Sequence, residues 1–151
     1  MRGTAILAND VITLTNVTKL PSGRAIAAEY RGTLLMNIYA PSGTAKSHES
    51  EYFFNNELPY LLRPPTARMI IGGDFNYVIA TSDTTGHYNH SRALVELIHG
   101  FELEDTWQQT RIARIYTTQK LLEKKLGVEI IAVAFTDHHA VFLRLAVDTP
   151  Y

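Results

Sequence analysis

The sequence predicts one layered α/β or α+β domain in which the strands pair mainly antiparallel. Short alternating segments follow one another with tight turns between them, and segments of helical spacing separate these runs. This order is typical of sheets with helices packed on them. The chain has 151 residues, of which 46% are hydrophobic, so it can bury one core. No repeat or linker divides it, and residues 1–151 are predicted to form one domain.

Three strands are predicted in the first forty residues. Residues 11–17, 25–30 and 33–39 alternate between apolar and polar or small side chains for most of their length. Pro21-Ser22-Gly23 and Arg31-Gly32 are turn signals between them. Strands joined by such tight turns indicate an antiparallel meander.

Helices and further strands alternate in the rest of the chain. Residues 47–62 carry aromatic and aliphatic side chains at helical steps, and Pro59 predicts a kink or an early end. Ser91 is a candidate N-cap for a helix over 93–99, with Gly100 just past its end. The remaining predicted elements are a loop over 80–89, a helix over 119–126 closed by Gly127, and strands near 69–71, 112–116, 128–134 and 140–147.

Charge and composition exclude some kinds of site. The chain has no cysteine, which excludes a disulfide scaffold and a thiolate metal site. Its formal net charge is −1, so any binding of phosphate groups requires a local patch of Lys and Arg. The N-terminal apolar run is too short for a signal peptide, and no stretch approaches the roughly 20 apolar residues of a membrane span. We expect an intracellular protein with no membrane partner.

The first candidate site is Gly72-Gly73-Asp74-Phe75-Asn76, directly after a short buried strand. A carboxylate there can bind a hard divalent cation or accept a proton from water. The Asn76 amide can hold that water or a phosphate oxygen without adding charge, and the glycines permit a sharp turn. An ordinary Asp/Asn turn after a strand is the alternative interpretation.

Two further clusters lie at predicted strand ends. Thr136-Asp137-His138-His139 places a metal-binding or proton-accepting carboxylate beside an imidazole; a solvated polar hairpin is the alternative. Tyr39, just before Ala40-Pro41, can offer its hydroxyl to a phosphate or can be a core or rim aromatic.

The order of these clusters resembles the endonuclease/exonuclease/phosphatase family, to which DNase I and the apurinic-site endonucleases belong. Tyr39-Ala40-Pro41, Gly73-Asp74-Phe75-Asn76 and Asp137-His138 follow one another at strand ends as in that family. Other segments are also similar: Gly3–Leu7 to the strand that opens the family's middle portion, Ser91–Leu94 and Leu103–Trp107 to the endonuclease domains of LINE-type (non-LTR) retrotransposons, and Arg111–Tyr116 to the motif Arg-Ile-Asp-x-Ile.

The resemblance implies a DNase I-like two-layered β-sandwich flanked by helices, with the active site where the strand-end loops of two sheets meet. By this resemblance Asp74 activates the attacking water, Asn76 orients water and phosphate, and Tyr39 contacts the phosphate. Asp137 is a metal or proton-relay carboxylate, and His138 stabilises the transition state. Asp74 and Asp137 are the implied metal ligands, and Arg111 is a further candidate substrate contact; His139 inherits no fixed role.

Three departures from the family pattern predict an incomplete domain. The family's opening strand with an Asn, and a later strand with a metal-binding Glu, have no counterparts here, so the chain is expected to be N-terminally truncated. Ala113 stands where the family has an Asp that orients the active-site His. Residues 107–110 run almost directly into Arg111, where related domains insert a loop and a strand from the middle of a sheet. We therefore expect unpaired sheet edges.

These features leave three functional hypotheses. The first is a Mg²⁺- or Mn²⁺-dependent phosphodiester hydrolase, a DNA-nicking endonuclease of retrotransposon type, with weak metal binding and impaired activity in this chain. Its implied partners are DNA and a downstream reverse transcriptase domain in a parent polyprotein, and its implied location is the nucleus. The alternatives are a non-catalytic remnant or weak nucleic-acid-binding domain, and a phosphatase acting on phosphoesters or inositol lipids, which the same fold supports.

Overall fold

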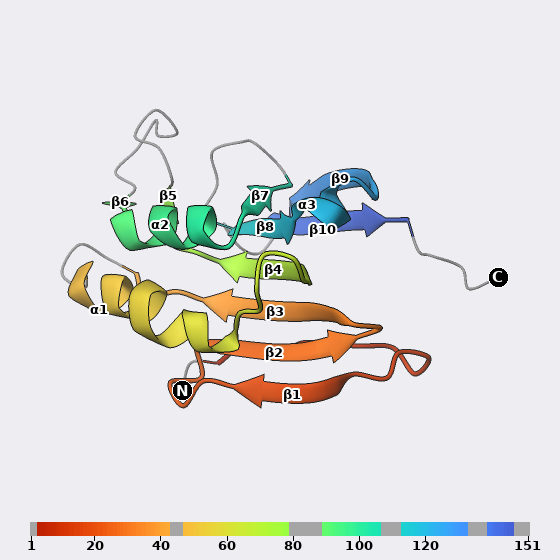
Figure 1. Ribbon diagram of the computed structural model, residues 1–151, viewed down its shortest axis with the longest axis horizontal. Coiled ribbons are helices and arrows are strands. Elements are labelled where there is room, and N and C mark those ends of the chain that lie inside the picture. Colours follow the sequence, from red (N-terminus) through yellow and green to blue (C-terminus); the bar gives the residue numbers. More distant parts are fainter. Residues whose placement is uncertain (1–2, 43–46, 79–88, 107–112, 133–138, 147–151) are drawn as a thin grey trace.

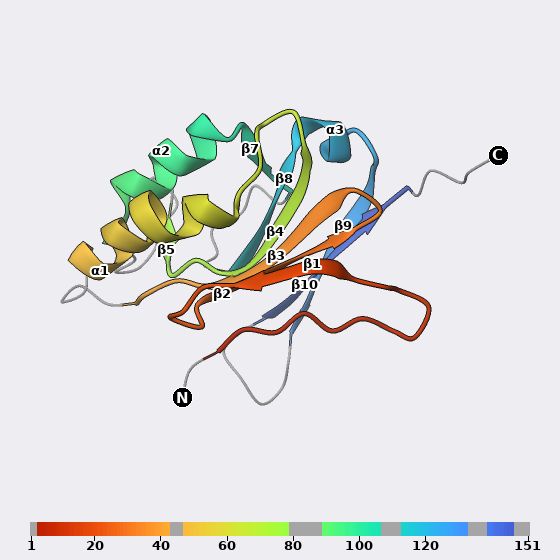
Figure 2. The same ribbon diagram turned by 60° about the horizontal axis from the view of Figure 1, so that its bottom comes forward.

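The computed structural model describes residues 3–42, 47–78, 89–106, 113–132 and 139–146. They form a mixed α/β fold built on a six-stranded sheet, with two helical segments on one face and a two-stranded ribbon near the other (Figure 1, Figure 2). The predicted α/β (α+β) class is confirmed.

The main sheet begins with the predicted meander. The strands β1 (Thr15–Lys19), β2 (Ala25–Tyr30) and β3 (Thr33–Tyr39) pair antiparallel in sequence order. β1 begins at Thr15, although the predicted strand covered residues 11–17. The first residues of that segment form a turn instead, in which the Ile12 N–H donates to Asn9 O (3.0 Å). Pairing with β2 begins only at Thr15, opposite Glu29.

The rest of the sheet departs once from antiparallel pairing. β4 (Arg68–Asp74) runs parallel to β3, and β8 (Ala113–Thr118) and β7 (Leu103–Asp105) follow antiparallel, in the order β1-β2-β3-β4-β8-β7. A parallel pair needs a long crossover, and residues 47–61 supply it in helical form. The described strands β4, β8 and β7 pair in that order without a break. Residues 107–110, where the loss of a strand was expected to leave unpaired edges, lie outside the described residues.

The helical crossover changes type along its length. α1 (Ser47–Tyr52) widens into the π-helical turn η2 (Phe53–Glu57) and then tightens into the 3₁₀ turn η3 (Leu58–Leu61). Pro59 lies in the first turn of η3, where its missing N–H costs no intrahelical bond. The predicted irregularity at Pro59 is thus confirmed.

The core lies between the helices and one face of the sheet. Met36 and Ile38 on β3, and Met69 and Ile71 on β4, alternate toward the helices and are almost completely buried. They pack in one cluster with aromatic and aliphatic side chains of η2, η3 and α2 (Arg92–Gly100): Phe53, Phe54, Leu58, Leu94 and Leu97.

The C-terminal elements differ from the prediction at one boundary. After α3 (Gln119–Leu122), β9 (Lys125–Ala132) pairs antiparallel with β10 (His139–Leu145). Gly127 was expected to close a helix but lies inside β9, opposite Arg144. Cross-strand pairing there overrides the local helical pattern.

Two short segments complete the description. β5 (Tyr77–Val78) and β6 (Asn89–His90) pair parallel beside the N-terminal end of α2. The expected strand at residues 3–7 is not formed, since these residues have no strand partner in the described part of the chain. They are extended across the sheet instead, where Asn37 Nδ2 donates to Ala5 O (2.8 Å).

Candidate active site

The candidate site lies where β3 and β4 end together. Because the two strands are parallel and in register, Tyr39 at the end of β3 lies directly beside Asp74 at the end of β4. Paired residues in adjacent strands point to the same face of a sheet. For these two residues it is the face away from the helices, which also carries Asn37 and Gly72. Both side chains are half-buried.

Three hydrogen bonds fix the loop that follows β4. The Asn76 N–H donates to Asp74 Oδ1 (3.0 Å), which is an Asx turn. The Asn76 side chain then crosses to the neighbouring strand end, where Nδ2 donates to Ala40 O (2.8 Å), while the Ala40 N–H donates to Asp74 O (2.9 Å). The carboxylate and the amide are therefore held in one rigid unit.

The sequence of this loop suits its backbone. Asn76 adopts a left-handed conformation (φ 56°), which Asn tolerates better than most residues. Phe75 is buried, and its ring meets Tyr116 edge-on with centroids 4.9 Å apart. The aromatic anchor points into the core while its two polar neighbours remain near the surface, so the alternation Asp-Phe-Asn has a structural reason.

Arg24 is a site neighbour that the sequence did not reveal. Its backbone O accepts from the Tyr39 N–H (2.8 Å), and its Nη1 donates to Tyr39 O (3.4 Å). Its Nη2 lies 2.9 Å from Glu49 Oε1 on α1. A cation thus stands beside the end of β3. In the sequence it is an isolated Arg after a turn, and only the β2–β3 register brings it to Tyr39.

Ala113 occupies the other side of Asp74. In the antiparallel β4–β8 pair, Asp74 lies directly opposite Ala113, so a methyl group stands beside the carboxylate. The position where the resembled family carries an Asp is therefore adjacent to Asp74 in space.

Three of the predicted site residues cannot be placed. Arg111, Asp137 and His138 lie outside the described residues. Of the six candidates, the structure brings together Tyr39, Asp74 and Asn76.

The donor set suits a hard cation but is small. The Asp74 carboxylate and the Asn76 amide offer oxygen, the ligand atom that Mg²⁺ and Mn²⁺ prefer. Within the described ranges, no three Asp, Glu or His side chains gather in a metal-binding group. The described part of the site therefore provides one charged ligand.

No protein-family model matches the sequence. A transposon TX1 uncharacterized 149 kDa protein from Xenopus laevis is 30% identical over 137 residues, covering 75% of this chain. The chain spans only 10% of that protein's length, so the match concerns a small part of a much larger protein.

Solved nucleases and phosphatases share the fold. An AP endonuclease from Archaeoglobus fulgidus superposes with a TM-score of 0.73 at 14% identity, covering 91% of this chain and 73% of that one. A Neisseria 3′ phosphatase bound to a product DNA hairpin gives 0.62 at 15% identity (90% and 72% covered), and a 3′–5′ exonuclease from Neisseria meningitidis gives 0.61 at 16% (89% and 72%). The chain therefore has the DNase I-like fold of AP endonucleases, 3′ phosphatases and exonucleases, and its sequence is related to part of a transposon protein.

Proposed function

We propose that this chain derives from a metal-dependent phosphodiester hydrolase, a DNA-nicking endonuclease of retrotransposon type, and that its activity is impaired. The observation that carries the proposal is the unit of Tyr39, Asp74 and Asn76 at the shared end of β3 and β4. A nuclease-like fold and a transposon relative support it.

Each residue of the unit has a role that its position supports. Asp74, fixed by the Asn76 N–H, is the proposed base that takes a proton from the attacking water. Asn76 is proposed to orient that water and the phosphate. Tyr39, on the same face as Asp74, is proposed to donate its hydroxyl to a phosphate oxygen. His138 and Arg111 are proposed to stabilise the transition state and to contact the substrate.

The proposed cofactor is Mg²⁺ or Mn²⁺, held weakly. When bound, such an ion neutralises charge on the phosphate and on the leaving oxygen. Asp74 and Asp137 are its proposed ligands. Two carboxylates leave most of an octahedral shell to water, which favours weak binding.

The proposed impairment rests on Ala113. A carboxylate opposite Asp74 would stand at the centre of the site, and alanine offers neither a hydrogen-bond acceptor nor a negative charge. Loss of one orienting group of this kind typically costs about 10- to 100-fold in activity or metal affinity.

The proposed partner is DNA, and the proposed setting is a polyprotein with a downstream reverse transcriptase that acts in the nucleus. One neighbour of the fold was solved with a DNA hairpin, and the transposon relative is far longer than this chain. No described helix is long and apolar enough to cross a membrane.

A non-catalytic DNA-binding domain is the second candidate, favoured by Ala113 beside Asp74. The two are separated by measuring nicking of supercoiled plasmid and anisotropy of a labelled DNA duplex, each with Mg²⁺ or Mn²⁺. We expect DNA binding that Tyr39→Phe weakens about tenfold, as for loss of one hydrogen bond to a charged group, and weak nicking that Asp74→Ala abolishes. DNA binding with no Asp74-dependent nicking would favour the non-catalytic domain. Tyr60→Phe is the matched control, because Tyr60 is 86% exposed on η3.

Two results would change this assignment. Robust metal-dependent nicking that Asp74→Ala abolishes would show that the chain is not impaired. DNA binding that Tyr39→Phe leaves unchanged would refute the proposed contact between Tyr39 and a phosphate oxygen.

A further inference from the structure

A row of neighbouring residues runs through the candidate site from β8 to the start of β2. Asp74 lies opposite Ala113 on one side and beside Tyr39 on the other. Arg24 stands one step beyond Ala25–Ile38, the last pair of the β2–β3 ladder, and its O accepts from the Tyr39 N–H (2.8 Å). Arg24 is therefore the neighbour of Tyr39 on the side away from Asp74.

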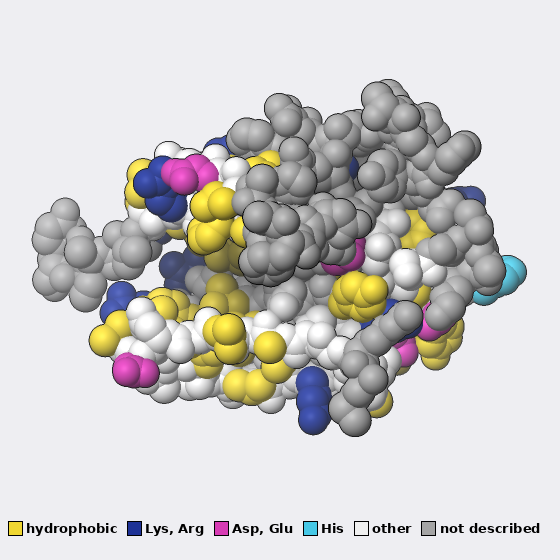
Figure 3. All heavy atoms as spheres, turned by 180° about the vertical axis from the view of Figure 1, so that it is seen from behind, with side chains coloured by type: hydrophobic (Ala, Val, Ile, Leu, Met, Phe, Trp, Pro, Cys, Tyr) yellow, Lys and Arg dark blue, Asp and Glu magenta, His cyan; other side chains and the backbone are white. Residues whose placement is uncertain are grey.

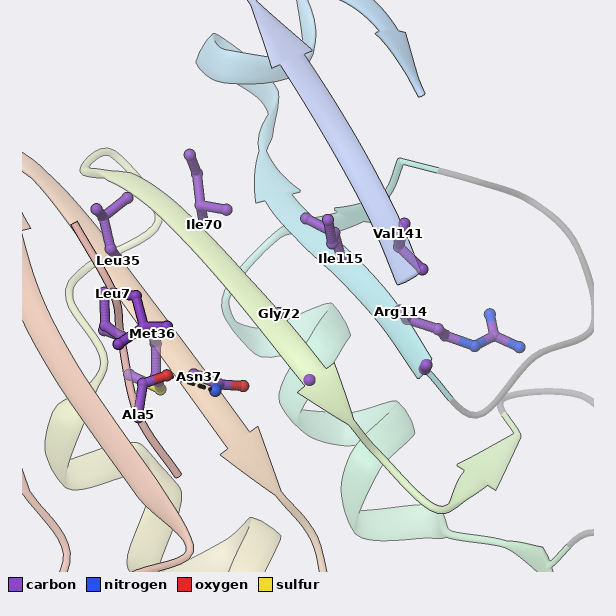
Figure 4. A pocket seen from close by; sticks show the side chains of 13 residues that line it. Ala5, Leu7, Leu35, Met36, Asn37, Ile70, Gly72, Arg114, Ile115 and Val141 are labelled. Carbon is purple, nitrogen blue, oxygen red and sulfur yellow. Dashed lines mark hydrogen bonds between the residues drawn. The ribbon is translucent and has the colours of Figure 1, made fainter. Parts of the chain in front are cut away.

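The two ends of this row differ in exposure. At Ala113 the row opens onto a groove of about 570 Å³, which Gly72 and Arg114 also line (Figure 4). At the other end, the Arg24 side chain is only 13% exposed. Seen from behind, the Lys and Arg side chains of the described surface do not form one continuous patch (Figure 3). The role of Arg24 has to follow from its own contacts, because no broad basic surface surrounds the row on that face.

The Arg24 guanidinium joins the end of β3 to the first turn of α1. Its Nη2 lies 2.9 Å from Glu49 Oε1, and its Nη1 donates to Tyr39 O at a longer 3.4 Å. An Arg that is mostly covered is normally paired, and its donors form a rigid fork with a fixed direction. Glu49 therefore sets the direction in which the fork meets the backbone of β3.

The held end of β3 is bonded in turn to the loop after β4. The Ala40 N–H donates to Asp74 O (2.9 Å), and Ala40 O accepts from Asn76 Nδ2 (2.8 Å). Contacts thus run without a break from Arg24 through residues 39–40 to the carboxylate and the amide of the site. A displacement of the end of β3 would move the Tyr39 side chain and disturb both of these bonds.

We propose that Arg24 is a positioning residue: anchored by Glu49, it fixes the end of β3 and thereby the place of the Tyr39 hydroxyl, without binding a phosphate itself. This inference rests on the proposed function and deepens it. The competing role for Arg24 is a direct contact with a DNA phosphate, for which Glu49 would be a competitor.

Glu49→Asp separates these roles, because it keeps the negative charge and shortens the side chain by one methylene. Loss of the anchor should weaken binding of a labelled DNA duplex, measured by anisotropy, about threefold or more. Unchanged or tighter binding would overturn the inference, since a competitor of the phosphate would have been withdrawn. Glu29→Asp is the matched control: Glu29 pairs with Arg63 (2.7 Å) near the other end of β2, and this change should alter DNA affinity less than about twofold.

A double-mutant cycle tests whether Arg24 acts through Tyr39. Arg24→Met and Tyr39→Phe should each weaken DNA binding about tenfold, and the double variant should bind less than about twofold more weakly than either one. Additive losses of about 100-fold would overturn the inference. So would a salt dependence of log affinity that falls by about 0.9 in Arg24→Met, as expected for loss of one phosphate contact. Arg24→Lys, which keeps the charge without the fork, should bind DNA as weakly as Arg24→Met.

Hydrogen exchange provides a readout that does not depend on DNA. Arg24→Met should speed exchange of the Ala40 amide about tenfold, because its acceptor, Asp74 O, is no longer held in place. The Met69 amide, bonded to Thr118 Oγ1 at the other end of β4, should keep its rate, which shows that the variant is folded. Absence of DNA binding by the unmutated chain would refute the proposed function. Unchanged exchange at Ala40, with or without DNA binding, would refute the positioning role of Arg24.

Discussion

Gly73 decides the local geometry of the site, because β4 passes too close to β3 at this point for any side chain. Its φ is +142°, and a Cβ there would lie 2.0 Å from Ile38 O. Gly72 differs, since a Cβ there would meet Ile115 Cγ1 at an ordinary 3.6 Å. The close approach at Gly73 brings Asp74 beside Tyr39.

Replacement of Gly73 and of Gly72 should therefore change the free energy of unfolding by unequal amounts. Gly73→Ala should lower the free energy of unfolding by more than about 3 kcal/mol, since the backbone has to move to relieve a clash and a strained φ. Gly72→Ala should cost less than about 1 kcal/mol, or stabilise slightly by reducing the entropy of the unfolded chain. Urea denaturation of both variants measures this, and equal losses would contradict the close approach.

Ala113 gives the second prediction at this scale. Ala113→Asp would place a carboxylate directly opposite Asp74 on the same face. Without metal, repulsion between like charges should destabilise the fold by roughly 0.2–1 kcal/mol. With Mn²⁺ the same pair should act as two ligands and raise metal affinity about tenfold.

Ala113→Asn is the matched control, since its amide carries no charge. Isothermal titration with Mn²⁺ and thermal unfolding with and without the ion measure both effects. Equal metal affinity of the Asp and Asn variants would show that the position does not reach the site.

The residues brought together at the site were partly foreseeable. Tyr39, Asp74 and Asn76 each follow a strand signal, so the sequence predicts that they lie at strand ends; their chemical roles stay a prediction. Arg24 was not foreseeable, because its contact with Tyr39 depends on which residues of β2 and β3 pair. Register is set by the whole sheet and is not visible in a local pattern.

Among the elements, α2 shows how a local signal and a distant residue act together. The predicted N-cap is confirmed: Ser91 Oγ accepts from the Leu94 N–H (3.2 Å). Glu51 on α1 completes the cap, accepting from Ser91 Oγ (2.6 Å) and from the Ala93 N–H (3.0 Å). The cap therefore also ties α1 to α2.

Loss of this cap should lower the free energy of unfolding in proportion to the number of hydrogen bonds removed. Ser91→Ala should lower the free energy of unfolding by about 1–2 kcal/mol. Glu51→Gln should cost about 1 kcal/mol, because a charged acceptor of two hydrogen bonds becomes neutral. Glu96→Gln is the control, because among the described residues Glu96 pairs with Arg92 alone, on an exposed helix face. This change should lower the free energy of unfolding by less than about 0.5 kcal/mol. Equal effects of the two Gln variants in chemical denaturation would exclude the cap function of Glu51.

Element boundaries were predicted less well than element types. The helical nature of 47–61 was clear from its spacing, but the change from α to π to 3₁₀ depends on how Phe53, Phe54 and Leu58 pack into the core. Gly127 looked like a helix end and instead lies in β9, because pairing with β10 dominates there.

On the scale of the whole molecule, the main sheet and the β9–β10 ribbon differ in how much of their apolar surface is buried. The main sheet packs its inner apolar face against helices in one buried cluster. The β9–β10 ribbon is held to it by packing on β8 and by Lys125 Nζ, which donates to Thr106 O just past β7 (3.0 Å). Leu126, Ile131 and Phe142 on the ribbon remain 71%, 48% and 50% exposed.

This difference predicts two levels of local stability. The ribbon buries little apolar surface, so it should open without unfolding of the main sheet, as structural units with few buried contacts do. Native-state hydrogen exchange should show amides of β3, β4 and β8 exchanging at least about 100-fold more slowly than amides of β9 and β10, a gap of roughly 2.7 kcal/mol in opening free energy. Met36→Ala should speed exchange of the main sheet, because it leaves a cavity in the core. Phe142→Ala, at an exposed ribbon position, should leave exchange of the main sheet unchanged. Uniform protection of the main sheet and the ribbon would mean that the two form one cooperative unit.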